Sequence, residues 1–279
     1  MYKILLFVSF LFVEQVIFAQ GDVDILGGKS AGMGKTSVAV ADVWSVSNNQ
    51  AGLAFLKDAQ IGIYYNNRFT TANTGFQTIA MAVPTKKSGT FGINVSYFGF
   101  SGYNESKIAF AYGKKLGEKF AVGIKANYLN TRLSDEYGNT GTVIGEIGLM
   151  GEPTKNLFVG ADLYNISRAM LVKDDVDDNV NVKVEIPTVL RLGLGYKFND
   201  NVFAAAEVEK DLTNKPIFKA GLDYKVVEKF YLRAGLSTYP TSSTFGIAYK
   251  TESLNIDLSF ATHQTLGMTP HISISYIFE

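Results

Sequence analysis

The sequence predicts an all-β fold: a transmembrane antiparallel β-barrel of about 14 strands with a short N-terminal hatch segment in its lumen. Three observations support this prediction. They are the apolar alternation of the last strand, a series of segments as long as tilted membrane strands, and the distribution of short connections between them. The expected organisation is a signal peptide over 1–19, the hatch segment over 20–58 and the outer-membrane barrel over 59–279.

The last nine residues have the pattern of a strand that closes a membrane barrel. Ile272, Ile274, Tyr276 and Phe278 lie on one face of such a strand, and the serines between them lie on the other. A soluble domain seldom ends on an open apolar strand because the free edge invites pairing, whereas the last strand of a membrane barrel pairs with the first. The tail also resembles the C-terminal signal of bacterial outer-membrane proteins, with Glu279 following the final aromatic residue. The alternative is the buried last strand of a β-sandwich.

From residue 59 onward the chain divides into segments of about 9–11 residues, the length that a tilted membrane strand requires. An even number of strands places both ends of a bacterial barrel on one side of the membrane. The expected strands lie near 59–68, 74–84, 89–99, 105–115, 118–132, 141–151, 156–166, 186–198, 201–210, 216–226, 229–238, 243–251, 253–262 and 270–279.

The segments have one apolar face and one face of small or charged residues. Phe91, Ile93 and Val95, for example, alternate with Gly92 and Asn94. A sheet face in water would carry more Lys, Glu and Thr, so the small residues indicate a narrow lumen that must fit its contents. Outer-membrane barrels have short periplasmic turns and longer extracellular loops. Every second connection here is expected to be tight, at 84–89, 114–119, 152–156, 199–201, 226–229 and 250–253, and the others longer.

The N-terminus predicts export. One charge at Lys3 precedes an apolar run over 4–13, and cleavage is expected after Ala19. The run of about ten apolar residues is too short for a transmembrane helix, which needs roughly 20. The chain has no Cys, which excludes disulfides and thiolate chemistry, and its net charge of zero gives no general attraction for nucleic acid.

Residues 20–58 lack the pattern of a membrane strand. Asp42, ahead of Val43–Val46, indicates a short helix with Asp42 near its N-cap. The stretches 30–34 and 49–54 resemble the opening of PorV/PorQ-type outer-membrane proteins, which belong with the FadL-like barrels and usually carry Asn-Pro-Ala-Gly. Gln50 stands here in place of the proline. The resemblance implies a hatch folded back into the lumen, with the motif residues Gly32, Gly34, Asn48, Asn49, Gln50, Ala51 and Gly52.

Two sequence motifs suggest ligand chemistry but fit poorly. A nucleotide-binding P-loop at Gly34–Thr36 would need a glycine five positions before its Gly-Lys pair, and Lys29 stands there. The longest loop holds an acidic cluster that lacks the glycine and glutamate of an EF-hand. A solvated loop explains it best, with weak contact to divalent cations or lipopolysaccharide as the alternative. The cluster is Asp174, Asp175, Asp177 and Asp178.

Catalysis and metal binding find no support in the sequence. His263 and His271 flank the last loop without a nearby carboxylate or third ligand, which makes a weak metal signal. No Ser/His/Asp spacing suggests a nucleophile. We therefore expect a protein that is not an enzyme and that has no cofactor and no metal.

Nine charged residues of mixed sign lie on the small-residue face and are expected inside the barrel. A salt-bridged network that packs the lumen and docks the hatch is one interpretation, and a pore lining that sets selectivity is the other. Two of them flank the tight turn at 226–229 at nearly matching distances, which predicts the cross-strand pair Asp223–Arg233. The nine are Lys125, Glu146, Asp162, Arg191, Glu207, Lys219, Asp223, Arg233 and Asp257.

Two functions are compatible with these features. PorV/PorQ-type proteins serve as accessory or shuttle components of type IX protein secretion, and the resemblance implies such a role. The alternative is a FadL-like channel for the uptake of small hydrophobic compounds. Expected partners are outer-membrane lipid and lipopolysaccharide, the barrel assembly machinery, and secretion-system proteins or secreted cargo, but no nucleic acid.

Three aromatic residues lie near an expected extracellular loop. Phe98 fits an aromatic belt at the membrane surface at least as well as contact with a partner. Phe100 and Tyr103 lie beyond the alternating row, where exposed aromatic side chains favour contact with a partner.

Overall fold

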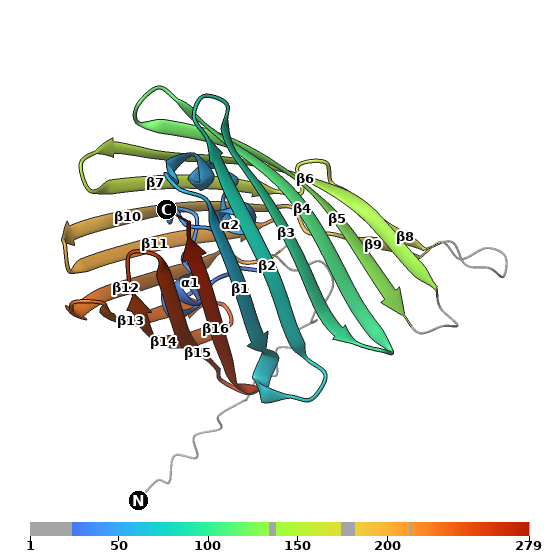
Figure 1. Cartoon of the computed structure of the whole chain (residues 1–279). Coiled ribbons are helices and arrows are strands. Elements are labelled where there is room, and N and C mark those ends of the chain that lie inside the picture. Colours follow the sequence, from blue (N-terminus) through green and yellow to red (C-terminus); the bar gives the residue numbers. More distant parts are fainter. Residues whose placement is uncertain (1–23, 134–137, 174–181, 213, 279) are drawn as a thin grey trace, which may run out of the picture.

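The computed structural model describes residues 24–133, 138–173, 182–212 and 214–278. Fourteen antiparallel strands form a closed barrel, which confirms the predicted fold class (Figure 1). The expected signal peptide lies outside the described residues. The barrel strands are β1 (Gln60–Asn67), β2 (Gly75–Thr85), β3 (Gly89–Phe100), β4 (Tyr103–Leu116), β5 (Phe120–Leu133), β6 (Asn139–Thr154), β7 (Leu157–Tyr164), β10 (Val189–Asn199), β11 (Val202–Asp211), β12 (Ile217–Val227), β13 (Phe230–Thr238), β14 (Thr241–Lys250), β15 (Leu254–His263) and β16 (Gly267–Ile277).

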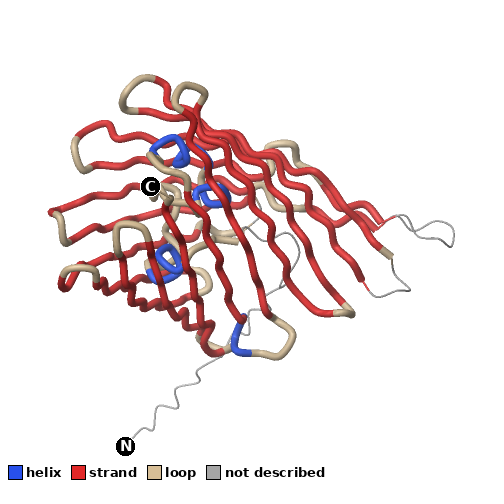
Figure 2. Tube along the Cα trace, in the orientation of Figure 1, coloured by secondary structure: helices blue, strands red, loops and turns tan. Residues whose placement is uncertain are grey.

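The last strand closes the barrel against the first. β16 pairs antiparallel with β1, with Ile274 opposite Ile63 and Tyr276 opposite Ile61. The start of β1 and the end of β16 therefore lie at one end of the barrel. Six short connections lie at the same end, at 86–88, 117–119, 155–156, 200–201, 228–229 and 251–253 (Figure 2). We call this the turn end, and the opposite end of the barrel the loop end.

The loop end differs from the prediction in two respects. Ser101–Gly102 joins β3 to β4, and Tyr239–Pro240 joins β13 to β14, so these connections are as short as those at the turn end. The long connection between β7 and β10 contains a hairpin of β8 (Met170–Lys173) and β9 (Val182–Glu185). The sequence did not predict this hairpin because four alternating residues cannot be told from a loop.

The outer face of the barrel is apolar. Large side chains such as Ile63, Phe110 and Ile247 point outward and are exposed. Four pairs of aromatic rings lie near the turn end with their centroids 4.9 to 5.1 Å apart. An apolar band with an aromatic girdle is typical of a barrel in lipid. The girdle pairs are Phe91–Tyr112, Tyr196–Phe198, Phe230–Tyr249 and Tyr276–Phe278.

No helix within the described residues combines the length and the apolar character needed to span a bilayer. The helices are short. They are α1 (Gly28–Gly32), α2 (Ser45–Asn48), η1 (Gln50–Phe55) and η2 (Arg68–Thr70).

The segment 24–58, which carries α1, α2 and η1, lies inside the barrel (Figure 1). We call it the hatch. Its apolar side packs on β1 and β2: Trp44 is 2% exposed and its ring meets the Tyr64 ring edge-on at 5.8 Å. Leu26, Val43 and Val46 belong to the same buried cluster. Burial of these apolar side chains stabilises the docked position of the hatch through the hydrophobic effect.

Glycines of the inner wall leave the space that the hatch occupies. Gly113 and Gly123 face each other across β4 and β5, beside Gln50 of the hatch. A Cβ added at Gly113 would lie 2.5 Å from the Gln50 carbonyl oxygen, and one at Gly92 would lie 2.7 Å from Val46 Cγ2. The small residues of the inner face are therefore explained by close contact between wall and hatch.

Candidate functional site

The candidate site is the interface between the hatch and the inner wall of the barrel. All nine charged residues expected in the lumen lie there, and each is at most 6% exposed. Because charge taken out of water is costly, such residues need partners.

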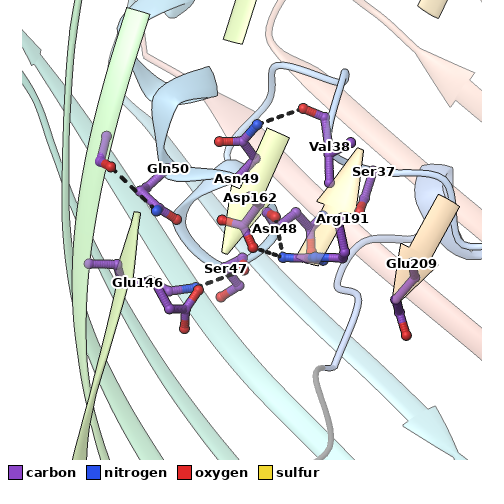
Figure 3. A network of polar contacts seen from close by, with 12 residues as sticks. Ser37, Val38, Ser47, Asn48, Asn49, Gln50, Glu146, Asp162, Arg191 and Glu209 are labelled. Carbon is purple, nitrogen blue, oxygen red and sulfur yellow. Dashed lines mark hydrogen bonds and ion pairs between the residues drawn. The ribbon is translucent and has the colours of Figure 1, made fainter. Parts of the chain in front are cut away.

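Arg191 of β10 has the most enclosed of these side chains and joins the wall to the hatch (Figure 3). Its Nη2 atom lies 2.6 Å from Asp162 Oδ2 of β7 and donates a second 2.6 Å hydrogen bond to the Asn48 carbonyl oxygen. Arg191 and Asp162 are opposite each other in the β7–β10 register. The pair therefore links two strands and the end of α2 in one contact.

A second ion pair contacts the same part of the hatch. Lys125 Nζ of β5 lies 2.6 Å from Glu146 Oε2 of β6, and it donates a 2.8 Å hydrogen bond to the Ser47 carbonyl oxygen. The Glu146 side chain also accepts from Asn127. Two wall cations thus bind successive carbonyl oxygens at the C-terminal end of α2, where cations are favoured.

Glu207 of β11 binds the hatch through its carboxylate. Its Oε2 atom accepts from the backbone N–H groups of Ser37 at 2.7 Å and Val38 at 3.0 Å. Its other oxygen lies 3.2 Å from Lys219 Nζ, which also lies 2.6 Å from Glu209 Oε2. Glu209 was absent from the predicted lumen set, although it lies two residues from Glu207 and therefore on the same face.

The predicted cross-strand pair Asp223–Arg233 is present, with Nε–Oδ1 at 2.9 Å, and Arg233 Nη1 also lies 2.6 Å from Asp257 Oδ1. Lys29 of α1 adds a hatch cation, 3.3 Å from Asp223 Oδ2. Lys29 was missed as a lumen residue because nothing in its local sequence shows that α1 packs against β13–β16.

Small hydroxyl side chains of β14–β16 bind the backbone around α1. The Gly28 N–H donates to Ser273 Oγ at 2.9 Å, and Ser259 Oγ donates to the Gly28 carbonyl oxygen at 2.7 Å. Thr244 Oγ1 accepts from the Gly34 N–H at 2.8 Å and donates to the Gly32 carbonyl oxygen at 2.9 Å. These bonds satisfy buried backbone groups that a short helix leaves unpaired.

The hatch motif residues lie at the points of closest approach to the wall. Gly34 has φ +68°, and a Cβ there would lie 2.6 Å from the Ala220 carbonyl oxygen, so both conformation and space require glycine. Asn49 Nδ2 donates to the carbonyl oxygens of Val38 at 2.7 Å and Leu149 at 3.0 Å. Gln50 begins η1, and Asn49 caps this helix by accepting from the Ala51 N–H. Ala51 and Gly52, within η1, are buried with them.

Asp42 lies three residues before α2 and is not its cap. Its Oδ1 atom accepts from the Trp44 N–H at 2.9 Å, which closes the turn ahead of the helix. Burial raises the pKa of the Asp42 carboxyl above its usual value, and the Lys29 ammonium opposes this shift.

Apolar side chains gather inside the loop end of the barrel. Leu129, Ile144 and Val189 point inward from β5, β6 and β10, and Leu171 of the β8–β9 hairpin packs on them. Tyr164 and Ile186 complete this cluster, which we call the mouth cluster. Each of the six side chains is at most 4% exposed, so the mouth cluster is a closed apolar core next to the buried ion pairs.

A polar cavity of about 20 Å³ adjoins the mouth cluster and has room for about one water molecule. Tyr164 lines both the cavity and the mouth cluster. Asp24, Leu26 and Ser47 of the hatch form part of the remaining lining, and the wall provides Asn94, Ser96, Lys107, Lys125, Asn127 and Glu146.

The two histidines lie apart in polar contacts, and the described residues contain no cluster of three metal-binding side chains. His271 Nδ1 lies 2.6 Å from the Tyr64 hydroxyl oxygen. His263 Nδ1 accepts from the N–H groups of Thr265 and Leu266, both at 3.2 Å, and so closes the last loop.

Of the aromatic residues near the β3–β4 connection, Phe98 lies inside the barrel and Phe100 is exposed at its surface. Phe98 packs on the apolar side of the hatch, and its ring centre lies 4.6 Å from the Arg68 guanidinium, so its assignment to a membrane belt is wrong. Phe100 is 45% exposed at the tip of β3. The Tyr103 hydroxyl donates to Glu105. The structure leaves Phe100 accessible to a partner.

Comparison with known proteins shows the fold. No protein-family model matches the chain, and no curated protein matches it in sequence. The structure is similar to the Ralstonia pickettii toluene transporter TbuX, with TM-score 0.70, 15% identity, and coverage of 92% of this chain and 100% of that one. The Pseudomonas putida toluene transporter TodX gives TM-score 0.67 and 15% identity over 92% and 100% of the two chains.

A Pseudomonas aeruginosa FadL homologue gives TM-score 0.64 and 13% identity over 90% of this chain and 98% of that one. At such low identity the likeness shows the architecture alone, a closed antiparallel β-barrel. These similar structures are described as transporters or as a FadL homologue, and none of the comparisons supports the PorV/PorQ affiliation.

Proposed function

We propose that this protein is an outer-membrane channel of the FadL-like type that takes up small hydrophobic compounds. The apolar outer face and the aromatic girdle support a position in lipid. Short turns face the periplasm in outer-membrane barrels, so the turn end is periplasmic and the loop end extracellular.

The mouth cluster carries the proposal. It provides inward-facing apolar side chains at the extracellular end, where a hydrophobic compound would leave water, and the β8–β9 hairpin covers it through Leu171. Its six side chains are each at most 4% exposed, so a compound reaches the cluster only when these side chains move apart, and it would then bind through the hydrophobic effect. The hatch lies directly below, so passage requires the hatch to shift or part of its interface to open.

Toluene is a suitable probe because two proteins of similar structure are described as toluene transporters. Leu171→Asp places a charge in the mouth cluster and should abolish the saturation-transfer NMR signal of toluene with the folded barrel. Leu212→Asp is the control, because Leu212 is 64% exposed and lies outside the mouth cluster. An equal signal from the two variants, with both barrels folded, would contradict a binding surface at the mouth cluster.

The role in type IX secretion rests on the sequence resemblance alone. No observation among the described residues favours it over the channel. Phe100 is the accessible residue at which a surface partner would be sought.

A further inference from the structure

We propose that lysines on three neighbouring turns form a docking surface for anionic phospholipid headgroups in the leaflet at the turn end. This inference rests on the proposed location in a membrane but not on the identity of the transported compound. We call the surface the lysine patch, and it consists of Lys86, Lys87, Lys114, Lys119 and Lys155.

The lysine patch is a continuous surface. The Tyr112 hydroxyl of β4 donates to the Ser88 carbonyl oxygen of the β2–β3 turn. Lys119 of the β4–β5 turn reaches the β6–β7 connection, where its Nζ atom donates to the Pro153 carbonyl oxygen at 2.9 Å. The Glu152 N–H donates in turn to the Lys119 carbonyl oxygen at 2.8 Å. The three turns are therefore held side by side.

The charge of the lysine patch is not neutralised by the protein. All five lysines are exposed, and Glu118 and Glu152 are the acidic residues within the stretches 86–88, 114–119 and 152–156. None of the five takes part in an ion pair with any other residue that the structure describes.

The turns that join β10 to β15 carry a smaller excess of positive charge, and some of their lysines are paired. Lys197 lies 2.8 Å from Asp200 Oδ1 in the β10–β11 turn, and Lys250 lies 3.8 Å from Asp223 Oδ2. Lys225 and Lys229 at the β12–β13 turn also lack an ion pair with a described residue. The stretches 197–201, 225–229 and 250–253 hold four lysines and three acidic residues, whereas 86–88, 114–119 and 152–156 hold six lysines and two acidic residues. The excess positive charge is thus concentrated on the β2–β7 flank, which indicates an anionic partner on that side.

The position of the lysine patch along the membrane normal favours a lipid partner over a soluble one. Lys114 follows the girdle residue Tyr112 by two positions on the same outer face of β4. At about 3.3 Å per residue, its backbone lies roughly 7 Å beyond Tyr112 along the tilted strand. Headgroups occupy about 5–8 Å on each side of the hydrocarbon core. The Lys114 ammonium therefore lies at the level of lipid phosphates, and Lys86 and Lys87 adjoin Ser88, which contacts the girdle.

Lysine binds phosphate as a mobile point charge and suits a fluid headgroup layer. Each lysine near a membrane surface strengthens anionic lipid binding roughly fivefold. Replacing Lys86, Lys87 and Lys114 together by Gln should therefore weaken binding of phosphatidylglycerol about a hundredfold. A single charge deletion should have a proportionately smaller effect.

The test uses the folded full-length barrel in uncharged detergent, with retained lipid counted by native mass spectrometry. Mixed micelles contain either phosphatidylglycerol or phosphatidylcholine, and free glycerol phosphate is titrated separately. The matched control replaces Lys225 and Lys229 by Gln at the β12–β13 turn, away from the lysine patch, and is compared with the double variant in which Lys86 and Lys87 become Gln. We expect preferential retention of phosphatidylglycerol that is lost in the patch variant and largely kept in the control.

Equal retention of the two lipids, or equal losses in the two matched double variants, would overturn the proposal. Equally strong binding of glycerol phosphate would assign the lysine patch to a free phosphate compound instead of lipid. Unchanged lipid retention in the patch variant would refute lipid docking. An acidic soluble protein would then be the alternative partner of the lysine patch. None of these outcomes depends on toluene binding, so a failure here is distinguishable from failure of the channel proposal.

Discussion

Arg191 and Asp162 form an ion pair across β7 and β10 in which both side chains are fully enclosed, with Nη2 and Oδ2 2.6 Å apart. The same Nη2 atom donates to the Asn48 carbonyl oxygen of the hatch. One guanidinium group thus connects two wall strands with a segment that lies 143 residues earlier in the chain. The position of the hatch therefore depends on the integrity of this pair.

Arg191→Met should destabilise the folded barrel by about 3–5 kcal/mol, because it leaves the Asp162 carboxylate buried without its cation. Urea unfolding in lipid vesicles measures the loss. Lys197→Met is the control, since the Lys197–Asp200 pair is exposed and such pairs contribute about 0–1 kcal/mol. A loss of similar size in both variants would refute the structural role of the buried pair.

The double variant Arg191→Met/Asp162→Leu should recover much of that stability. Replacing a buried ion pair by apolar side chains removes the uncompensated charge and is often neutral. If the double variant is as unstable as the single one, the lost hydrogen bond to Asn48 dominates the effect instead of the unpaired carboxylate.

The assignment of the outer face to lipid can be tested by placing an arginine at two depths in the membrane. Ile272 lies near the middle of β16 and points outward, whereas Val226 points outward at the turn end of β12. Ile272→Arg should cost about 2–4 kcal/mol at the bilayer midplane, and Val226→Arg about 0–1 kcal/mol near the interface. Unfolding in vesicles provides both values. Equal costs would be inconsistent with the assigned lipid-facing surface.

The strands could be predicted from the sequence because their signals are local. All fourteen barrel strands lie within a few residues of the expected segments; for example, 118–132 corresponds to β5 (Phe120–Leu133). The boundaries of each strand follow from the alternation of apolar residues and from the turn residues beside it, which are signals within a window of about ten residues. The inward position of the nine charges follows from the same period of two, because a residue two positions along a strand lies on the same face.

Features that depend on distant contacts could not be predicted. The charge of Lys29 was visible, but its position beside Asp223 depends on where α1 packs. Phe98 belongs to the inner face, yet its place near the end of β3 made it resemble a belt residue. The β8–β9 hairpin is held by packing of Leu171 on Leu129 and Ile144, and no turn signal in the described residues announces it.

The inner-wall glycines that contact the hatch suggest how the hatch can be displaced. Gly113→Val places a Cβ about 2.5 Å from the Gln50 carbonyl oxygen, so the hatch must move away from β4. Conductance in planar bilayers should rise while the barrel stays folded. Gly145→Val is the matched control, since a Cβ there meets Ile166 Cγ2 at 3.3 Å, outside the hatch. Unchanged conductance in the Gly113 variant would show that the wall charges alone close the bore.

Uptake of toluene by cells tests the channel most directly. Cells whose outer membrane carries this protein in place of other hydrocarbon channels should take up labelled toluene several-fold faster than cells without it. Uptake of glycerol, a polar solute of similar mass, should not change, because we expect the hatch and the buried ion pairs inside the barrel to exclude hydrophilic solutes. Equal rates of toluene uptake with and without the protein, or a parallel rise for glycerol, would contradict a channel for small hydrophobic compounds.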